Sequence, residues 1–150
     1  MHLRRATIDD ALDVLDWRND PHTRAMSREA AIVDRQAHLD WFARAVEDPS
    51  RLLLMGEADG DRIGMVRFDR VGETWEVSIN VAPRARGRGL GAPLLDGALQ
   101  VFAGLHPDAT VLAVIKPENV ASLRLFEGLG FQPEGGDGVL LHFSRRQERP

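Results

Sequence analysis

Hydrophobic positions along the chain follow two spacings, which predict a mixed α+β fold. Apolar residues recur every three or four positions where helices are expected, and they alternate or run together where strands are expected. The predicted helices are one that starts after Thr7, then Arg35–Glu47, Gly89–Leu105 and Asn119–Leu129. The predicted strands are Leu3–Arg5, Arg51–Glu57, Arg62–Phe68, Thr74–Val81, Thr110–Ile115 and the apolar segments around Phe131 and Val139–Phe143.

Each predicted helix carries an apolar stripe that would face the sheet. The stripes are Leu12 and Leu15 in the first helix, Trp41, Phe42, Ala45 and Val46 in the second, and Leu90, Leu94, Ala98, Val101 and Leu105 in the third. Thr7 is an N-cap candidate, and the polar stretch with Pro21 is expected to end the first helix. Asn119 and Gly130 are expected to cap the last helix at its two ends.

Turn signals define the connections between the strands. Asp59-Gly60-Asp61 favours a tight hairpin and Gly72 a second turn, so the three central strands should form an antiparallel meander. Thr74–Val81 and Thr110–Ile115 are joined by a helix and should therefore be parallel. No repeat or linker divides the chain, which predicts a single domain over residues 1–150 with a frayed tail at Arg145–Pro150.

Composition excludes several classes of protein. With 43% hydrophobic and 28% charged residues, the chain is too apolar to be disordered and too charged for a membrane protein. No apolar run approaches the ~20 residues of a membrane span and the N-terminus lacks a signal-peptide h-region, so a cytoplasmic location is expected. A net charge of −4 argues against nucleic-acid binding. The absence of cysteine excludes thiolate chemistry, and five histidines without H-x-x-x-H spacing give no reason to expect a metal.

The most informative segment follows the strand Thr74–Val81. An arginine-rich turn leads into glycines that open a helix, with the sequence Arg86-Gly87-Arg88-Gly89-Leu90-Gly91-Ala92. Backbone N–H groups at such a helix start can bind a phosphate, although a solvated turn would have the same composition. The segment also fits the dinucleotide fingerprint G-x-G-x-x-[GA], but the loop Ala82–Arg86 is too long and Asp108 precedes its strand.

These residues resemble the GNAT superfamily of acyl-CoA N-acyltransferases. Arg86–Gly91 matches its signature [QR]-x-x-G-x-[GA], and Asn119–Phe131 is similar to a second family block, N-x-x-[AS]-x-x-L-[YF]-x-x-x-G-F. The resemblance implies acetyl-CoA as co-substrate and a mostly antiparallel sheet of six to seven strands with about four helices on both faces. The CoA contacts that it implies are Ile79, Asn80, Val81, Arg86, Gly87, Arg88, Gly89, Leu90, Gly91, Ala92, Asn119, Ser122 and Phe126.

The resemblance also implies catalytic roles. Glu76 stands where many family members carry a general base, the Val81 N–H is the expected oxyanion donor, and alternation puts Glu76, Ser78 and Asn80 on one face of their strand. Glu76 can equally be a solvated strand residue. Many relatives carry a tyrosine at the position of Phe126 to protonate the CoA sulfur. This chain has no tyrosine, so water, Ser122 or no group takes that role.

The N-terminal third carries the clues to the acceptor. Its W-R-N…R…M…I…H…W-F pattern resembles a branch that acetylates nucleotide-linked amino sugars in pseudaminic-acid-type pathways. The implied acceptor contacts are Arg18, Asn19, Arg24, His38 and Trp41. Core packing of Trp17, Met26 and Trp41 and a local hydrogen bond of His38 are the alternative interpretations.

Two other functions remain open at this point. A ribosomal-protein-type N-terminal acetyltransferase would share the fold and would be favoured by an acidic groove. A catalytically silent acyl-CoA-binding module is the other, because the tyrosine is missing. The expected partner is a small-molecule amine, with no nucleic acid and no membrane, and the chain is taken to be a monomer or a homodimer.

Overall fold

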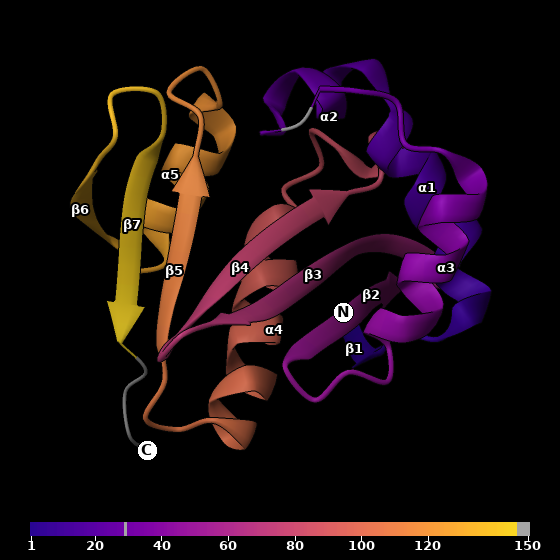
Figure 1. Ribbon diagram of the computed structural model, residues 1–150, viewed down its shortest axis with the longest axis horizontal. Coiled ribbons are helices and arrows are strands. Elements are labelled where there is room, and N and C mark those ends of the chain that lie inside the picture. Colours follow the sequence, from indigo (N-terminus) through magenta and orange to yellow (C-terminus); the bar gives the residue numbers. More distant parts are fainter. Residues whose placement is uncertain (29, 147–150) are drawn as a thin grey trace.

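The computed structural model describes residues 1–28 and 30–146, which form one seven-stranded sheet flanked by helices (Figure 1). The strands lie in the order β1-β2-β3-β4-β5-β7-β6. Their bounds are β1 His2–Arg5, β2 Arg51–Ala58, β3 Asp61–Val71, β4 Thr74–Val81, β5 Thr110–Ile115, β6 Gln132–Gly136 and β7 Leu141–Arg146. The helices of this part of the chain are α1 Ala11–Asn19, α2 Pro21–Met26, α3 Arg35–Ala45, α4 Gly91–Leu105 and α5 Val120–Gly128, with short 3₁₀ turns η1 Ile8–Asp10 and η2 Pro83–Ala85.

The strand pairing confirms the predicted topology. β2, β3 and β4 form an antiparallel meander, and β4 pairs with β5 in parallel across the connection through α4. Asp59 and Gly60 adopt φ of +53° and +82°, which are the left-handed conformations of a two-residue hairpin turn. The mixed, mostly antiparallel sheet follows from these local signals.

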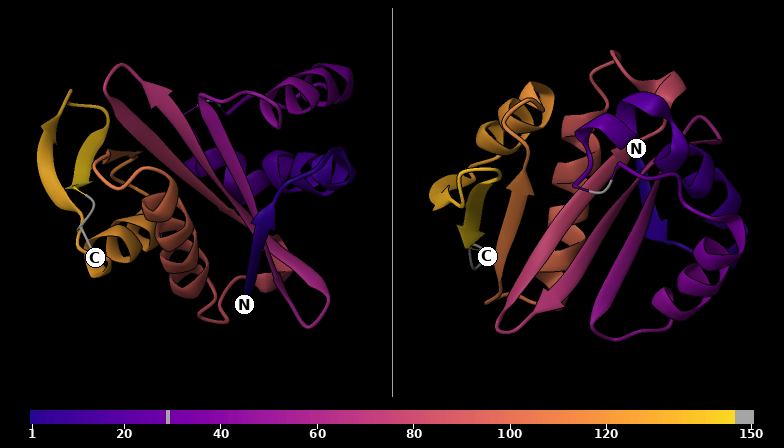
Figure 2. Two further views of the ribbon diagram at one scale, coloured as in Figure 1. Left: turned by 90° about the horizontal axis from the view of Figure 1, so that it is seen from below. Right: turned by 45° about the horizontal axis from the view of Figure 1, so that its top comes forward.

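Helices cover both faces of the sheet, as Figure 2 shows. α4 and α5 pack on one face over even-numbered residues of β2 and β3, such as Leu54 and Phe68. α1 and α3 pack on the other face over odd-numbered residues, such as Leu53 and Met65. Because successive side chains of a strand point to opposite faces, the same strands contribute to two separate hydrophobic cores.

Several predicted helix features are wrong in detail. A further helix, α2, occupies the polar stretch where the chain was expected to leave helical structure, because Asp20 caps it and Pro21 takes its first position. Leu12 is 48% exposed, since α1 buries Ala11, Val14, Leu15 and Trp17 instead. Val101 and Leu105 are also exposed, because α4 turns Leu94, Leu95, Ala98, Leu99 and Phe102 to the sheet. No helix within the described ranges is long and apolar enough to cross a membrane.

The C-terminal block follows its predicted caps. The Asn119 side chain accepts the Ser122 N–H at 3.2 Å, and Gly130 has φ of +87° just after α5. Phe131 then folds back so that its ring meets Phe126 edge to face, with centroids 4.9 Å apart. The predicted frayed tail is too long: Arg145 and Arg146 belong to β7, and residues 147–150 lie outside the described residues.

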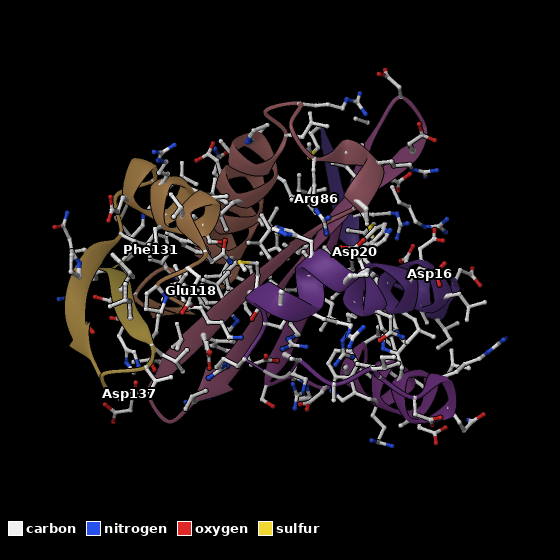
Figure 3. The ribbon with its side chains drawn as sticks, turned by 90° about the horizontal axis from the view of Figure 1, so that it is seen from above. Asp16, Asp20, Arg86, Glu118, Phe131 and Asp137 are labelled. Carbon is white, nitrogen blue, oxygen red and sulfur yellow. The ribbon has the colours of Figure 1, made fainter. Side chains whose placement is uncertain are left out.

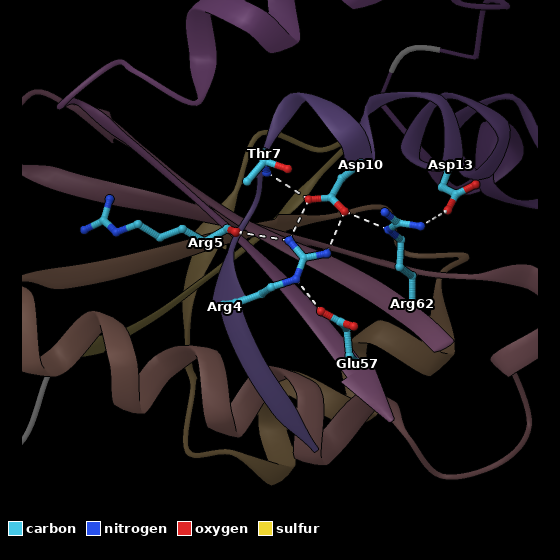
Figure 4. Close-up of polar contacts among 7 residues, drawn as sticks. All are labelled: Arg4, Arg5, Thr7, Asp10, Asp13, Glu57 and Arg62. Atoms are coloured by element: carbon cyan, nitrogen blue, oxygen red, sulfur yellow. Dashed lines mark hydrogen bonds and ion pairs between the residues drawn. The ribbon is translucent and has the colours of Figure 1, made fainter. Parts of the chain in front are cut away.

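A buried carboxylate joins β1, η1 and β3 (Figure 4). Asp10 is fully buried and accepts hydrogen bonds from Arg4 at 2.7 and 2.8 Å, from Arg62 at 2.7 Å and from the Thr7 N–H at 2.8 Å. Burial alone would raise the pKa of Asp10, but the hydrogen bonds outweigh burial and lower the pKa to about 2. Asp10 is therefore an anion that holds the start of the chain to the sheet.

Candidate active site

The sheet opens between its two parallel strands. The last β4–β5 pair within the described residues is Glu76 with Leu112; beyond it β4 continues along β3 and β5 along β7, so the strands diverge (Figure 1). The Ala82 N–H donates to the Ile63 carbonyl of β3 at 2.8 Å. Backbone N–H groups of consecutive strand residues point to opposite edges of the strand. Because the Ala82 N–H points to β3, the Val81 N–H points into the opening.

Two cavities meet at this opening. The larger has a volume of about 600 Å³ and lies between β4, β5 and the helices α1 to α3. The smaller, about 410 Å³, lies over the loop between β4 and α4. Both are lined by Thr23, Met26, Ser27, Ile79, Asn80, Asn119 and Ser122. A molecule bound in the smaller cavity can therefore extend through the opening into the larger one.

The loop under the smaller cavity has the conformation that its glycines allow. Gly87 and Gly89 adopt φ of +72° and +69°, and a Cβ added at either would meet no atom within 4 Å. Glycine is thus required by the backbone and leaves the loop surface open to a ligand. α4 begins at Gly91, and the first N–H groups of a helix have no helical acceptors and carry a partial positive charge.

Most residues predicted to hold CoA come together here. Ile79, Asn80, Val81, Arg86, Gly87, Gly89, Leu90, Gly91, Asn119 and Ser122 line the smaller cavity, and Phe126 lines the larger one. Arg88 and Ala92 are exposed and line neither cavity. The predicted set is therefore one continuous surface apart from these two positions.

The Arg86 side chain forms hydrogen bonds with residues at the start of α2. Its guanidinium donates to the Asp20 carboxylate at 2.9 Å and also contacts the Thr23 hydroxyl, and Figure 3 shows Asp20 and Arg86 side by side. The Thr23 N–H and the Arg86 guanidinium together lower the pKa of Asp20. Arg86 thus ties α2 to the glycine loop, a contact that the family signature does not indicate.

Glu76, Ser78 and Asn80, which alternation puts on one face of β4, all line the larger cavity, and parts of Val77 and Ile79 line it as well. The Glu76 side chain is 17% exposed, and its Oε1 accepts a hydrogen bond from Arg28 at 2.5 Å. The opposite face of β4 turns Val77 into the core beneath α4. Glu76 is therefore a carboxylate inside the cavity and not a solvated strand residue.

The α3 side of the larger cavity holds His38 and Trp41. His38 is 1% exposed; its Nε2–H donates to the Ala11 carbonyl at 2.8 Å, which leaves Nδ1 to accept from Arg18 at 3.0 Å. Burial lowers the pKa of His38 and the nearby Arg18 charge acts in the same direction, whereas the Ala11 hydrogen bond opposes them. The ring is thus neutral at pH 7, and it orients Arg18 at the cavity wall.

Two predicted acceptor contacts do not reach the cavity. The Asn19 side chain donates to the Val33 carbonyl at 3.1 Å and accepts the Val33 N–H at 2.7 Å, so it holds the segment before α3. Arg24 is exposed and donates to the Ala30 carbonyl at 3.0 Å. Both side chains stabilise the connection between α2 and α3.

Sequence reasoning missed a set of cations in the larger cavity. Arg28, Arg51, Arg67 and Lys116 line it together with Arg18. Lys116 also donates to the Ala25 carbonyl at 3.1 Å, which links β5 to α2 across the mouth. Alternation along β2 and β3 would have placed Arg51 and Arg67 on the face opposite Leu54 and Phe68, but it does not show which residues of other elements they meet. Among the described residues there is no group of three or more His, Cys, Asp or Glu side chains that could hold a metal ion.

Comparison with known proteins identifies the class. A family model described as "Acetyltransferase (GNAT) domain" matches residues 1–132. The L-methionine sulfoximine/L-methionine sulfone acetyltransferase of Pseudomonas aeruginosa is 30% identical over 145 residues, which cover 89% of this chain and 81% of that protein.

Solved structures share the fold. Spermidine N-acetyltransferase from Vibrio cholerae, in complex with CoA and spermine, has a TM-score of 0.86 at 18% identity, with 97% of this chain and 95% of that chain covered. Ribosomal-protein-alanine N-acetyltransferase from Brucella melitensis has a TM-score of 0.83 at 23% identity, with 97% and 99% covered.

The chain belongs to the GNAT acetyltransferase family. It is an acetyl-CoA-dependent N-acetyltransferase, with acetyl-CoA as its co-substrate. The acceptors named for the relatives are an amino-acid derivative, a polyamine and a ribosomal protein, so the shared fold does not define the acceptor of this chain.

Proposed function

We propose that this enzyme transfers the acetyl group of acetyl-CoA to the primary amine of a small molecule held in the larger cavity. The observation that carries the proposal is the meeting of the two cavities at the β4–β5 opening. In this arrangement the CoA pyrophosphate binds the N–H groups of Gly87–Gly91, and the thiol arm follows the free edge of β4 at Ile79–Val81. Asn119 and Ser122 flank the arm at the start of α5.

The catalytic step uses groups on β4. Glu76 accepts the proton of the acceptor ammonium through a water, after the acceptor has displaced Arg28 from its carboxylate. The neutral amine attacks the acetyl carbonyl, whose oxygen accepts the Val81 N–H; the attacking nitrogen then loses its extra proton to water, the carbon–sulfur bond breaks and CoA leaves as a thiolate. Phe126 supplies no proton, and none is required because the thiolate of a thiol with a pKa of about 8.5 is already a tolerable leaving group.

For the acceptor we propose a nucleotide-linked amino sugar, with Trp41 stacking on a ring and Arg18 contacting a phosphate. The outward position of Arg24 removes one of the phosphate contacts expected from the sequence. An amino acid is the second candidate, and it is favoured by the 30% identity to an enzyme named for L-methionine sulfoximine and L-methionine sulfone. A basic protein N-terminus is disfavoured, because the charged residues that line the cavity within the described part of the chain are five cations and one carboxylate, Glu76.

The test is acetyl-CoA turnover, measured as thiol release, over a panel of acceptors. The panel holds a nucleotide-linked 4-amino sugar, L-methionine sulfone, spermidine and a peptide with an alanine N-terminus. We expect turnover with at least one of the first two and little with spermidine or the peptide. Faster turnover with spermidine or the peptide would refute the acceptor assignment, and no release with any amine would favour the silent binding module.

A further inference from the structure

We propose that three arginines gathered around Trp41 bind an acidic group of the acceptor, so that the enzyme selects small amines that also carry a carboxylate or a phosphate. The inference rests on the proposed function and names the chemistry of its second substrate. It concerns the part of the larger cavity that lies between α3 and the strands β2 and β3.

The cluster has one aromatic ring at its centre. The guanidinium carbons of Arg18, Arg51 and Arg67 lie 5.4, 5.9 and 5.1 Å from the centroid of the Trp41 ring, and all four residues line the larger cavity. Contact with an aromatic face fixes the plane of a guanidinium and leaves its N–H edge available for hydrogen bonds. Trp41 therefore organises donors from three different elements.

Arg67 has unused hydrogen-bonding capacity. Its Nε is buried and makes no hydrogen bond to any described residue, although the Asp69 carboxylate lies 2.8 Å away in an ion pair that lacks hydrogen-bond geometry. Asp69 offsets the charge of this buried donor, but the donor has no well-aligned hydrogen bond, which is uncommon in folded proteins. An oxygen of a bound anion would supply partners to this guanidinium, which is the usual ligand of carboxylates and phosphates.

Two arginines of the cluster share one carboxylate. Asp69 is shared, because it also accepts from Arg51 at 2.7 Å, and Asp48 lies 3.4 Å from Arg51. Among the described residues that line the larger cavity, five are cationic and one, Glu76, is acidic. A chain with an overall charge of −4 thus keeps an excess of positive charge in this cavity.

The strand register places the anion site beside the catalytic carboxylate. Arg67 of β3 lies opposite Ser78 of β4, and Glu76 is two residues before Ser78 on the same face. Diagonal neighbours of this kind have Cα atoms roughly 7–8 Å apart. The acceptor should therefore carry its amine and its acidic group close together, an arrangement that both α-amino acids and compact amino-sugar phosphates can satisfy.

The experiment compares matched acceptors that differ only in the acidic group. L-Methionine sulfone and its carboxamide are titrated calorimetrically into the CoA-bound enzyme, and CoA release is measured with both, alongside a nucleotide-linked amino sugar. We expect the acid to bind about tenfold or more tightly than the carboxamide, since a charge-assisted contact typically contributes that much. A preference for the nucleotide sugar over both would identify a phosphate as the recognised group.

Variants assign the preference to the cluster. Arg67→Gln should weaken binding of the acid, or of the nucleotide sugar if that is the better ligand, about tenfold, and leave the carboxamide unchanged. Arg67→Lys should retain part of the preference because it keeps the charge. Arg70→Gln, at an exposed position of the same strand, is the control and should change neither.

The inference would be overturned if the wild-type enzyme bound the acid and the carboxamide equally and the nucleotide sugar weakly. It would also be overturned if Arg67→Gln lowered the affinity for all ligands equally. Selective binding without any CoA release would support the anion site and refute the proposed transfer reaction. The two claims are therefore tested separately.

Discussion

Replacing Asp10 with asparagine tests the buried ionic network that joins β1, η1 and β3. Asparagine has nearly the same shape, but it carries no charge and its amide nitrogen opposes the guanidiniums of Arg4 and Arg62. Breaking a buried ion pair by removing one partner costs about 3–5 kcal/mol. The two arginines are 28% and 34% exposed and keep Glu57 and Asp13 as partners, so we expect the lower end, about 3 kcal/mol.

The pH dependence of stability gives a second estimate of what the Asp10 carboxylate contributes to the free energy of unfolding. The folded-state pKa of Asp10 is about 2, below its ordinary value of 3.8, so the contribution of Asp10 to stability is complete well above pH 4 and is lost as the pH falls toward 2. From the shift in pKa, the contribution of Asp10 to the free energy of unfolding is smaller than at pH 7 by about 1 kcal/mol at pH 3 and by about 2 kcal/mol at pH 2. The variant has no carboxyl at this position, so the difference in free energy of unfolding between wild type and variant should shrink by these amounts.

Urea unfolding followed by circular dichroism measures both effects, with the free energy of unfolding compared at pH 7 and pH 3. Asp13→Asn is the control, because that carboxylate is 43% exposed and makes one 3.1 Å contact with Arg62, a pair worth about 1 kcal/mol or less. A deficit for Asp10→Asn that does not exceed the control, or that stays constant between pH 7 and pH 3, would refute the reasoning.

Three further predictions concern the site. Gly89→Val should abolish CoA binding in calorimetry, because a side chain at φ of +69° distorts the loop, whereas Gly72→Val, at φ of +62° in a distant turn, should cost similar stability and leave CoA affinity intact. Glu76→Gln should lower kcat/KM about 100-fold and move the pH–rate profile to higher pH, with Glu73→Gln as the inert control; an unshifted profile would exclude Glu76 as the base. Phe126→Tyr should raise kcat less than about tenfold, and a larger gain would mean that sulfur protonation limits the rate.

Local patterns predicted most of the sheet, because strand alternation, turn glycines and helix caps act over a few residues. The parallel β4–β5 pair, the Asn119 cap and the shared face of Glu76, Ser78 and Asn80 all followed from them. α2 was missed because it buries no residue and has no apolar period, although Asp20-Pro21 is a recognisable helix start.

The acceptor side of the site was harder to predict, because it depends on contacts between segments far apart in the sequence. Asn19 and Arg24 have the residue types of ligand contacts, but they are used to hold the backbone between α2 and α3. Arg51 and Arg67 come together only when β2 and β3 are placed in register and α3 brings Trp41 over them. Sequence spacing alone does not contain that information.

A crystal structure of the enzyme with acetyl-CoA would test the central claim most directly. We predict that the pyrophosphate lies on the N–H groups of Gly87–Gly91, that the thiol arm runs along β4 in the opening, and that the acetyl carbonyl faces the Val81 N–H with Glu76 in the cavity beyond it. The account would be contradicted by CoA bound away from the glycine loop, or by β4 and β5 pairing past Glu76 and Leu112 so that the opening is closed.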